Sequence, residues 1–255
     1  MTPTTNAMTA PRTPRRAAPR SVRSIVRALS LAAALGALLA AGTAEAVPPA
    51  EKPSAPAASA RPSDEQLMTA LLARFAKAPG IFARYREEKH LAMLQAPLVN
   101  EGTIHFAPPG RLARHTLKPI ASSLIIDDNK VRFGGAEGAE SMDLGTNPVA
   151  RAFVDSFIML LAGNRAGLER YFTIKFASVH GPKAAPDAWH LALVPRTSPM
   201  DKVIKEIALD GHALVIREMV VREASGDWTA TTFSEVDTAH AYDAAEQARV
   251  FRIQK

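Results

Sequence analysis

The sequence predicts a mainly β fold of the α+β class, in which a large curved antiparallel sheet or barrel is covered by helices. Many short β-rich runs are joined by tight turns, as in consecutive hairpins. Between two sets of these runs lies a nearly all-apolar helical pattern, 148–161, which must be buried. About 190 residues follow Ser63, a length that suits one domain.

The first 62 residues precede this domain. Six arginines between Arg12 and Arg27 are followed by an apolar run, 28–42, and by an A-x-A cleavage site that ends at Ala46. This order predicts a secretion signal, 1–46, that is cleaved after Ala46. Residues 47–62 are rich in proline and alanine and predict a disordered linker. We therefore expect a periplasmic protein with one folded domain, 63–255.

Charge and cysteine content exclude several classes of protein. Six of the 31 basic residues and one of the 25 acidic residues lie in 1–46, so the remaining chain has 25 and 24. This balance gives no support for a nucleic-acid partner, which requires a basic face. The chain has no cysteine, which excludes thiol catalysis, Cys-based metal sites and a lipid-modified N-terminal cysteine.

The first half of the domain predicts a helix and then hairpins. Ser63 and Gln66 form a capping box before an amphipathic helix of about four turns, which ends at Pro79-Gly80. Strands are expected within 81–91, 98–106, 111–117 and 124–133, where the last run holds a hairpin. Glycine-rich 134–138 lacks the Lys-Ser/Thr of a phosphate-binding loop and predicts a hairpin turn.

The second half predicts the apolar helix and a further set of strands. Asn147 is a good N-cap, Pro148 suits the first helical position and Gly163 suits the position after the end. A short helix is expected near 165–170, and strands within 171–176, 189–193, 204–209, 214–221 and 229–233. The tail, 244–253, is expected to pass from a helical turn into a last strand.

No catalytic motif is recognisable, so we expect a binding protein that needs no cofactor. His105 and His115 could face one another on neighbouring strands as a two-histidine metal site, but no third ligand is evident, and both are expected on a solvent-facing surface. Asp127-Asp128 precedes Asn129-Lys130 and indicates turn chemistry.

Large apolar residues could form a concave wall, and the alternative for each is an ordinary packed core. The candidate wall residues are Phe82, Tyr85, Ile104, Phe106, Leu112, Leu117, Ile126, Phe133, Trp189 and Leu191. The candidate lid residues on the apolar helix are Phe153, Phe157, Ile158 and Leu161. A curved sheet with an apolar helix over it either fills its interior or holds a ligand.

The order of short motifs resembles the LolA family of periplasmic lipoprotein carriers. The resemblance spans about Leu67 to Phe233. The motifs are the strand 102–106, Pro109-Gly110-Arg111-Leu112, Lys118-Pro119, Leu124-Ile125-Ile126-Asp127-Asp128, Trp189-x-Leu-x-Leu-x-Pro195, the strand 204–210 and Gly226-Asp227 leading into 229–233.

The resemblance implies a half-open antiparallel barrel of about ten strands with helices over its mouth. It also implies a monomeric carrier that shields lipid or lipoprotein acyl chains between an inner-membrane donor complex and an outer-membrane acceptor. Pro108 stands where relatives often have a basic residue that ties the lid, and Arg114 stands where they often have tryptophan. The alternatives are a periplasmic scaffold with a filled interior and an enzyme acting through the His105/His115 region.

Overall fold

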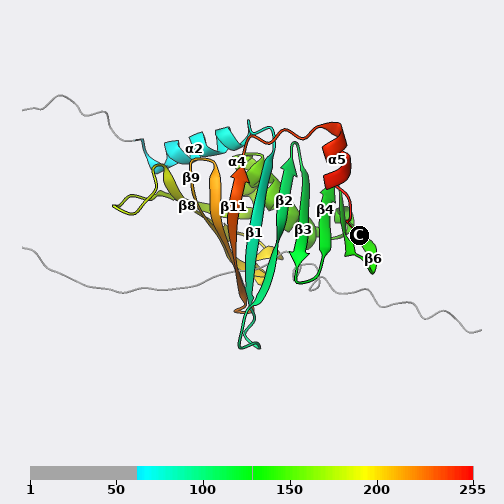
Figure 1. Ribbon diagram of the computed structural model, residues 1–255. Helices are drawn as coiled ribbons and strands as arrows, with labels where there is room; N and C mark the ends of the chain where they lie inside the picture. Colours follow the sequence, from blue (N-terminus) through cyan, green and yellow to red (C-terminus); the bar gives the residue numbers. More distant parts are fainter. Residues whose placement is uncertain (1–61, 128, 255) are drawn as a thin grey trace, which may run out of the picture.

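The fold is built on one antiparallel sheet of eleven strands (Figure 1). The computed structural model describes residues 62–127 and 129–254. The predicted signal, most of the predicted linker and Asp128 therefore lie outside the described residues. The strands are β1 (Ile81–His90), β2 (Leu98–Ala107), β3 (Arg111–Lys118), β4 (Ser122–Asp127), β5 (Lys130–Gly135), β6 (Gly138–Asp143), β7 (Phe172–Ser178), β8 (Ala188–Pro195), β9 (Ile204–His212), β10 (Val215–Glu223) and β11 (Trp228–Asp237).

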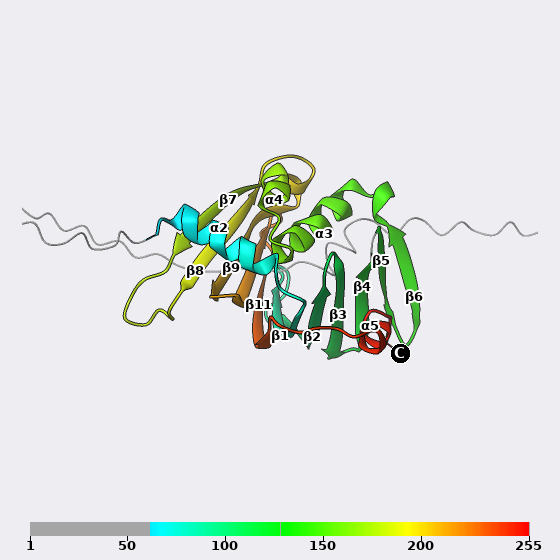
Figure 2. The ribbon, with the colours of Figure 1, turned by 90° about the horizontal axis from the view of Figure 1, so that it is seen from above.

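The sheet is strongly curved but does not close. Its order is β6-β5-β4-β3-β2-β1-β11-β10-β9-β8-β7, so β1 and β11 meet at the centre and β6 and β7 form the two edges. Seen along the strands, the sheet wraps around one side of the molecule and leaves the other side open (Figure 2). This arrangement confirms the predicted half-open antiparallel barrel.

Four helices and two short 3-10 turns, η1 (Leu144–Thr146) and η2 (Met200–Lys202), complete the fold. The helices are α2 (Asp64–Phe75), α3 (Pro148–Leu161), α4 (Arg165–Tyr171) and α5 (Ala244–Val250). Ser63 and Gln66 form the predicted capping box of α2. The Asn147 side chain accepts a 3.0 Å hydrogen bond from the Ala150 amide at the start of α3. Gly163 follows α3 with φ of 63°, a conformation that glycine adopts at little cost.

The helices divide between the two faces of the sheet. α2, α3 and α4 lie over the open, concave side, whereas α5 packs against the convex side of β3 and β4 (Figure 2). Val250 and Phe251 there cover Ala113 and Ile125. Both faces of β3 and β4 are consequently buried, which explains the continuous apolar run of 124–126.

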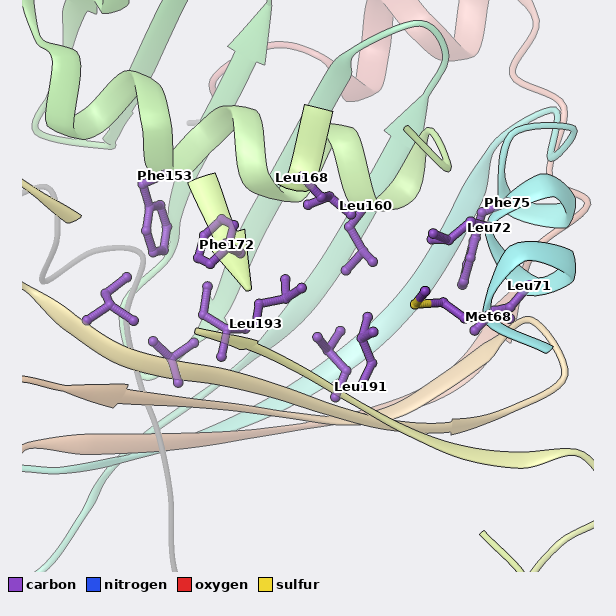
Figure 3. Close-up of a cluster of buried hydrophobic side chains, with 14 of the residues drawn as sticks. Met68, Leu71, Leu72, Phe75, Phe153, Leu160, Leu168, Phe172, Leu191 and Leu193 are labelled. Carbon is purple, nitrogen blue, oxygen red and sulfur yellow. The ribbon is translucent and has the colours of Figure 1, made fainter. Parts of the chain in front are cut away.

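The main core lies between α2, α3 and the half of the sheet that contains β7 to β10. Figure 3 shows Met68, Leu71, Leu72 and Phe75 of α2 pointing toward Leu160 of α3 and toward the sheet. A second cluster lies between α3 and the other half of the sheet, with Leu112, Leu124, Ile126, Val131 and Val154 among its members. The helix α3 therefore joins the two clusters across the mouth.

The sheet has eleven strands, in agreement with the expected number of about ten. The polar run Gly138–Asp143, for which no strand was predicted, forms the edge strand β6. The expectation of a last strand in the tail is corrected. Within the described tail no strand follows α5, since residues 251–254 pack along the convex face instead of joining an edge. No helix in the described ranges is long and apolar enough to cross a membrane.

Candidate functional site

The concave face of the sheet changes from apolar to charged along its central strand. On β1, Ile81, Ala83, Tyr85, Glu87 and Lys89 are buried and alternate with residues that are less buried. Alternate residues of a strand share a face, so these five side chains line one row inside the half-barrel. The row is apolar near α2 and carries charge near the β1–β2 turn.

Two adjoining cavities lie between this face and α3. The first, here called the apolar cavity, has a volume of about 70 Å³ and is lined almost wholly by carbon. The second, the mixed cavity, has a volume of about 60 Å³ and also meets Glu87, Arg114 and Thr231. The residues that line both cavities are Ile104, Leu112, Phe157, Met219 and Phe233.

Tyr85 lines the mixed cavity, and Gly102 on the neighbouring strand leaves room for its ring. A Cβ atom on Gly102 would lie 2.9 Å from the ring and 1.9 Å from the His115 carbonyl oxygen. The Tyr85 hydroxyl is hydrogen bonded to Thr116 Oγ1 at 2.9 Å. Burial raises the pKa of this hydroxyl, so Tyr85 stays neutral at ordinary pH.

Charged side chains form two pairs at the polar end of the row. The guanidinium of Arg114 lies over the Tyr85 ring, 4.4 Å from its centroid, and its Nη2 lies 2.9 Å from Glu87 Oε1. Asn100 Nδ2 donates a 3.0 Å hydrogen bond to the same carboxylate oxygen. Two residues further along β1, Lys89 Nζ lies 3.9 Å from Glu223 Oε1. The charges within each pair balance.

The helix α3, which carries the candidate lid residues, covers both cavities. Phe157 lines both, and Leu161 lines the apolar cavity. Phe153, one turn before Phe157, is instead packed in the main core with 2% of its surface exposed. Ile158 Cγ2 lies 3.4 Å from where a Cβ on Gly110 would be, so this part of α3 rests on the β2–β3 turn.

Five of the ten candidate wall residues line the cavities. They are Tyr85, Ile104, Phe106, Leu112 and Ile126. Phe133 and Leu191 face inward but pack in the core clusters. Trp189 is also in the core, and its ring reaches a separate groove of about 710 Å³ between α2 and the β7–β8 loop.

The positions expected for Phe82 and Leu117 are corrected, because both lie on the convex face. Phe82 packs against the ring of His105 on β2. It also packs against the ring of His240, which the C-terminal segment brings to that face. Leu117 lies an odd number of residues from Leu112 on the same strand, which places it on the opposite face. It is 50% exposed.

Several lining residues were not anticipated from the sequence. They are Phe75, Ile81, Ala83, Leu160, Leu209, Leu214, Ile216, Met219, Phe233 and Val236 of the apolar cavity, and Glu87, Arg114, Leu124, Val154 and Thr231 of the mixed cavity. The β11 members could have been found from the alternation of Thr229, Thr231 and Phe233, which share one face.

The two candidate metal-binding histidines lie on the convex face beneath α5. His105 Nδ1 and Nε2 are hydrogen bonded to Tyr242 and Thr103, each at 3.1 Å. His115 Nδ1 is 2.9 Å from Ser123 Oγ. Within the described ranges no group of three or more His, Asp or Glu side chains is placed to hold a metal ion.

Comparison with known proteins identifies the family. Residues 57–253 match the family described as outer membrane lipoprotein carrier protein LolA-like. The chain belongs to this LolA-like family. No curated protein sequence matches it.

Solved structures are similar to this LolA-like chain at low sequence identity. A putative outer membrane lipoprotein-sorting protein domain from Vibrio parahaemolyticus has 9% identity and a TM-score of 0.43, and the match covers 73% of this chain and 98% of that one. The MucA/MucB complex of Pseudomonas aeruginosa has 14% identity and a TM-score of 0.41, and the match covers 70% of this chain and 59% of that one. The lipoprotein LppX of Mycobacterium tuberculosis has 10% identity and a TM-score of 0.39, and the match covers 71% of this chain and 100% of that one.

Coverage differs among these structures. The LolA-like chain spans about three fifths of the length of the MucB chains that it matches, 58% to 61%. It spans nearly all of the shorter Vibrio domain and of LppX.

Proposed function

We propose that this protein is a periplasmic carrier that shields lipid acyl chains inside its half-barrel during transfer toward the outer membrane. The observation that carries the proposal is the apolar cavity, which lies under a helical lid and is lined almost wholly by carbon. Each buried methylene contributes about 0.8 kcal/mol, so a long chain supplies ample binding energy. Membership of a family of lipoprotein carriers supports the same role.

The size of the cavities implies that the lid moves. Volumes of about 70 and 60 Å³ hold only a few groups of the size of water, each of which needs about 10 to 15 Å³ of such space. A chain of twelve or more carbons needs more space. The structure therefore corresponds to a closed state, and uptake requires displacement of α3 from the sheet.

Exposed apolar side chains at one end of the sheet support an encounter with a membrane or a membrane-bound partner. Met93 at the β1–β2 turn is 82% exposed, and Ile120 at the β3–β4 turn is 78% exposed. Both turns lie at the same end of the half-barrel (Figure 1). Neither side chain contributes to a core cluster, so their exposure fits a role in contact rather than in stability.

The two small cavities beneath α3 leave part of the interior unfilled, which favours the carrier over a scaffold with a fully packed interior. An enzyme acting through His105 and His115 is disfavoured by their place on the convex face, away from both cavities. The donor complex, the acceptor and the monomeric state remain proposals drawn from the family.

Native mass spectrometry tests the carrier role directly. The protein is purified from the periplasm without detergent, and its lipids are extracted from the same sample. We expect a bound acyl-bearing species in near-stoichiometric amounts. A mass without ligand, together with no uptake of a fluorescent fatty-acid probe, would contradict the proposal and favour the scaffold.

A further inference from the structure

The mixed cavity contains a polar group that the protein itself leaves unsatisfied. Thr231 Oγ1 is buried and has no hydrogen-bond partner among the described residues. The residue is only 4% exposed, and it lines the cavity together with Glu87, its partner on the neighbouring strand. A buried hydroxyl without a partner costs about 1 to 3 kcal/mol, so such groups are rare and call for an explanation.

The surroundings of this hydroxyl offer both donors and acceptors. Glu87 contributes carboxylate oxygens, and Arg114 contributes N–H groups, within the same cavity. The adjoining cavity offers only apolar wall. A ligand that occupied both cavities would therefore have an apolar part and a small hydrogen-bonding part.

The balance of charge restricts the nature of that polar part. Glu87 is paired with Arg114, and Lys89 with Glu223, and all four side chains are largely buried. An anionic head would meet the Glu87 carboxylate, and a cationic head would meet the Arg114 guanidinium, in surroundings where water screens little. An uncharged head that can donate and accept avoids both penalties.

We propose that the half-barrel binds an amphiphile with an uncharged, hydroxyl-bearing head, such as a monoacylglycerol, whose head bonds to Thr231, Glu87 and Arg114. The acyl chain then lies in the apolar cavity beneath Phe157. This inference rests on the proposed carrier function and adds the class of head group to it.

Displacement of a bound fluorescent fatty-acid probe by ligands with one common C14 chain tests the inference. The ligands are the monoacylglycerol, the fatty-acid methyl ester, the free fatty acid at pH 8 and the alkyl trimethylammonium ion. We expect the monoacylglycerol to bind roughly threefold to tenfold more tightly than the methyl ester, the range that one or two hydrogen bonds provide. The two charged ligands should bind more weakly than the monoacylglycerol.

Two variants assign the preference to the cavity. Thr231→Val keeps the shape of the side chain and removes the hydroxyl, so it should abolish most of the preference without loss of thermal stability. Thr232→Val is the matched control, because Thr232 is adjacent, exposed and on the opposite face of β11. It should leave the order of affinities unchanged.

The outcomes separate the two proposals. Equal affinity for monoacylglycerol and methyl ester, tightest binding of a charged ligand, or an unchanged preference in Thr231→Val would each overturn the head-group site and leave the carrier intact. If neither the probe nor any of the C14 ligands bound to the protein, the carrier function would be overturned as well.

Discussion

Nε2 of His115 donates a 2.8 Å hydrogen bond to the carbonyl oxygen of Val250 and so ties the end of α5 to the convex face of β3. The other ring nitrogen lies 2.9 Å from Ser123 Oγ. His105 packs beside it, with 5.7 Å between the ring centroids. The tail is thus held by two partly or fully buried imidazoles, His115 at Val250 and His105 at Tyr242.

We expect this attachment to make the protein sensitive to mild acid. Burial lowers the pKa of His115 from its ordinary value, and burial with the nearby charges of His115, His240 and Arg249 lowers the pKa of His105 to about 4. In the unfolded chain the histidines bind protons below about pH 6.5, whereas in the folded protein they do so only at lower pH. Because the unfolded state then binds more protons, the free energy of unfolding falls as pH drops from about 6.5 toward 4. At pH 5 the loss from His105 is on the order of 1 kcal/mol, allowing for its partial exposure.

Urea unfolding at pH 7 and pH 5 measures this loss. His105→Gln should lose less stability between the two pH values than the wild type does. His180→Gln is the control, because His180 is exposed in the β7–β8 loop, and it should behave as the wild type. An equal acid loss in all three proteins would contradict the assignment.

The same substitution at two positions of α3 should separate ligand binding from folding. Phe157→Asp places a carboxylate where both cavities meet, and we expect it to weaken acyl-chain binding at least tenfold with a moderate loss of stability. Phe153→Asp acts on a packed core side chain and should cost several kcal/mol, comparable with deletion of a buried ring. Probe binding and thermal unfolding are measured on both variants. If the two variants lost stability and affinity in equal proportion, Phe157 would be ordinary core.

A reversible cross-link tests whether the lid must move. The chain has no cysteine, so Gly110→Cys combined with Ile158→Cys introduces the only two thiols. The two positions are in contact, since a Cβ at position 110 would lie 3.4 Å from Ile158 Cγ2. We expect the oxidised protein to take up long acyl chains much more slowly than the reduced one, while a short chain is less affected. The two single variants control for the substitutions. Equal uptake by the oxidised and reduced forms would show that α3 need not leave the β2–β3 turn.

Charges on the exposed turns should slow transfer without changing affinity. In the variant Met93→Glu/Ile120→Glu, we expect acyl chains to move from vesicles to the protein several-fold more slowly. Equilibrium binding of a soluble short-chain ligand should stay within twofold, because neither residue lines a cavity. Val179→Glu, at an exposed site in the β7–β8 loop, is the comparison variant. Unchanged transfer rates would exclude these turns from the encounter.

The helices and the class of fold could be predicted because their signals are local. The Ser63 capping box, the Asn147-Pro148 start of α3 and Gly163 after its end each fix one backbone position through a side chain or through conformational freedom. Tight turns likewise indicate which runs pair. The half-open shape itself came from the resemblance to a family rather than from any one residue.

The cavity wall was predicted less well because size and hydrophobicity do not say which face a residue occupies. Phe82 and Tyr85 lie three residues apart on one strand and so face opposite ways. Nothing local indicates that the C-terminal segment covers Phe82, since that contact joins residues far apart in the chain. Hydrophobicity also does not point to the charged residues Glu87 and Arg114, although they pair inside the mixed cavity.

The chain order gives α3 a second property. The segment 144–171, here called the clasp, connects one edge strand, β6, to the other edge strand, β7. It therefore joins the two edges of the open sheet. Proteolytic cleavage within it would leave the hydrogen bonds between β1 and β11 in place and keep both halves associated. The two edge strands would nevertheless no longer be joined. We expect a molecule cleaved there still to bind acyl chains but to release them faster than the intact protein does.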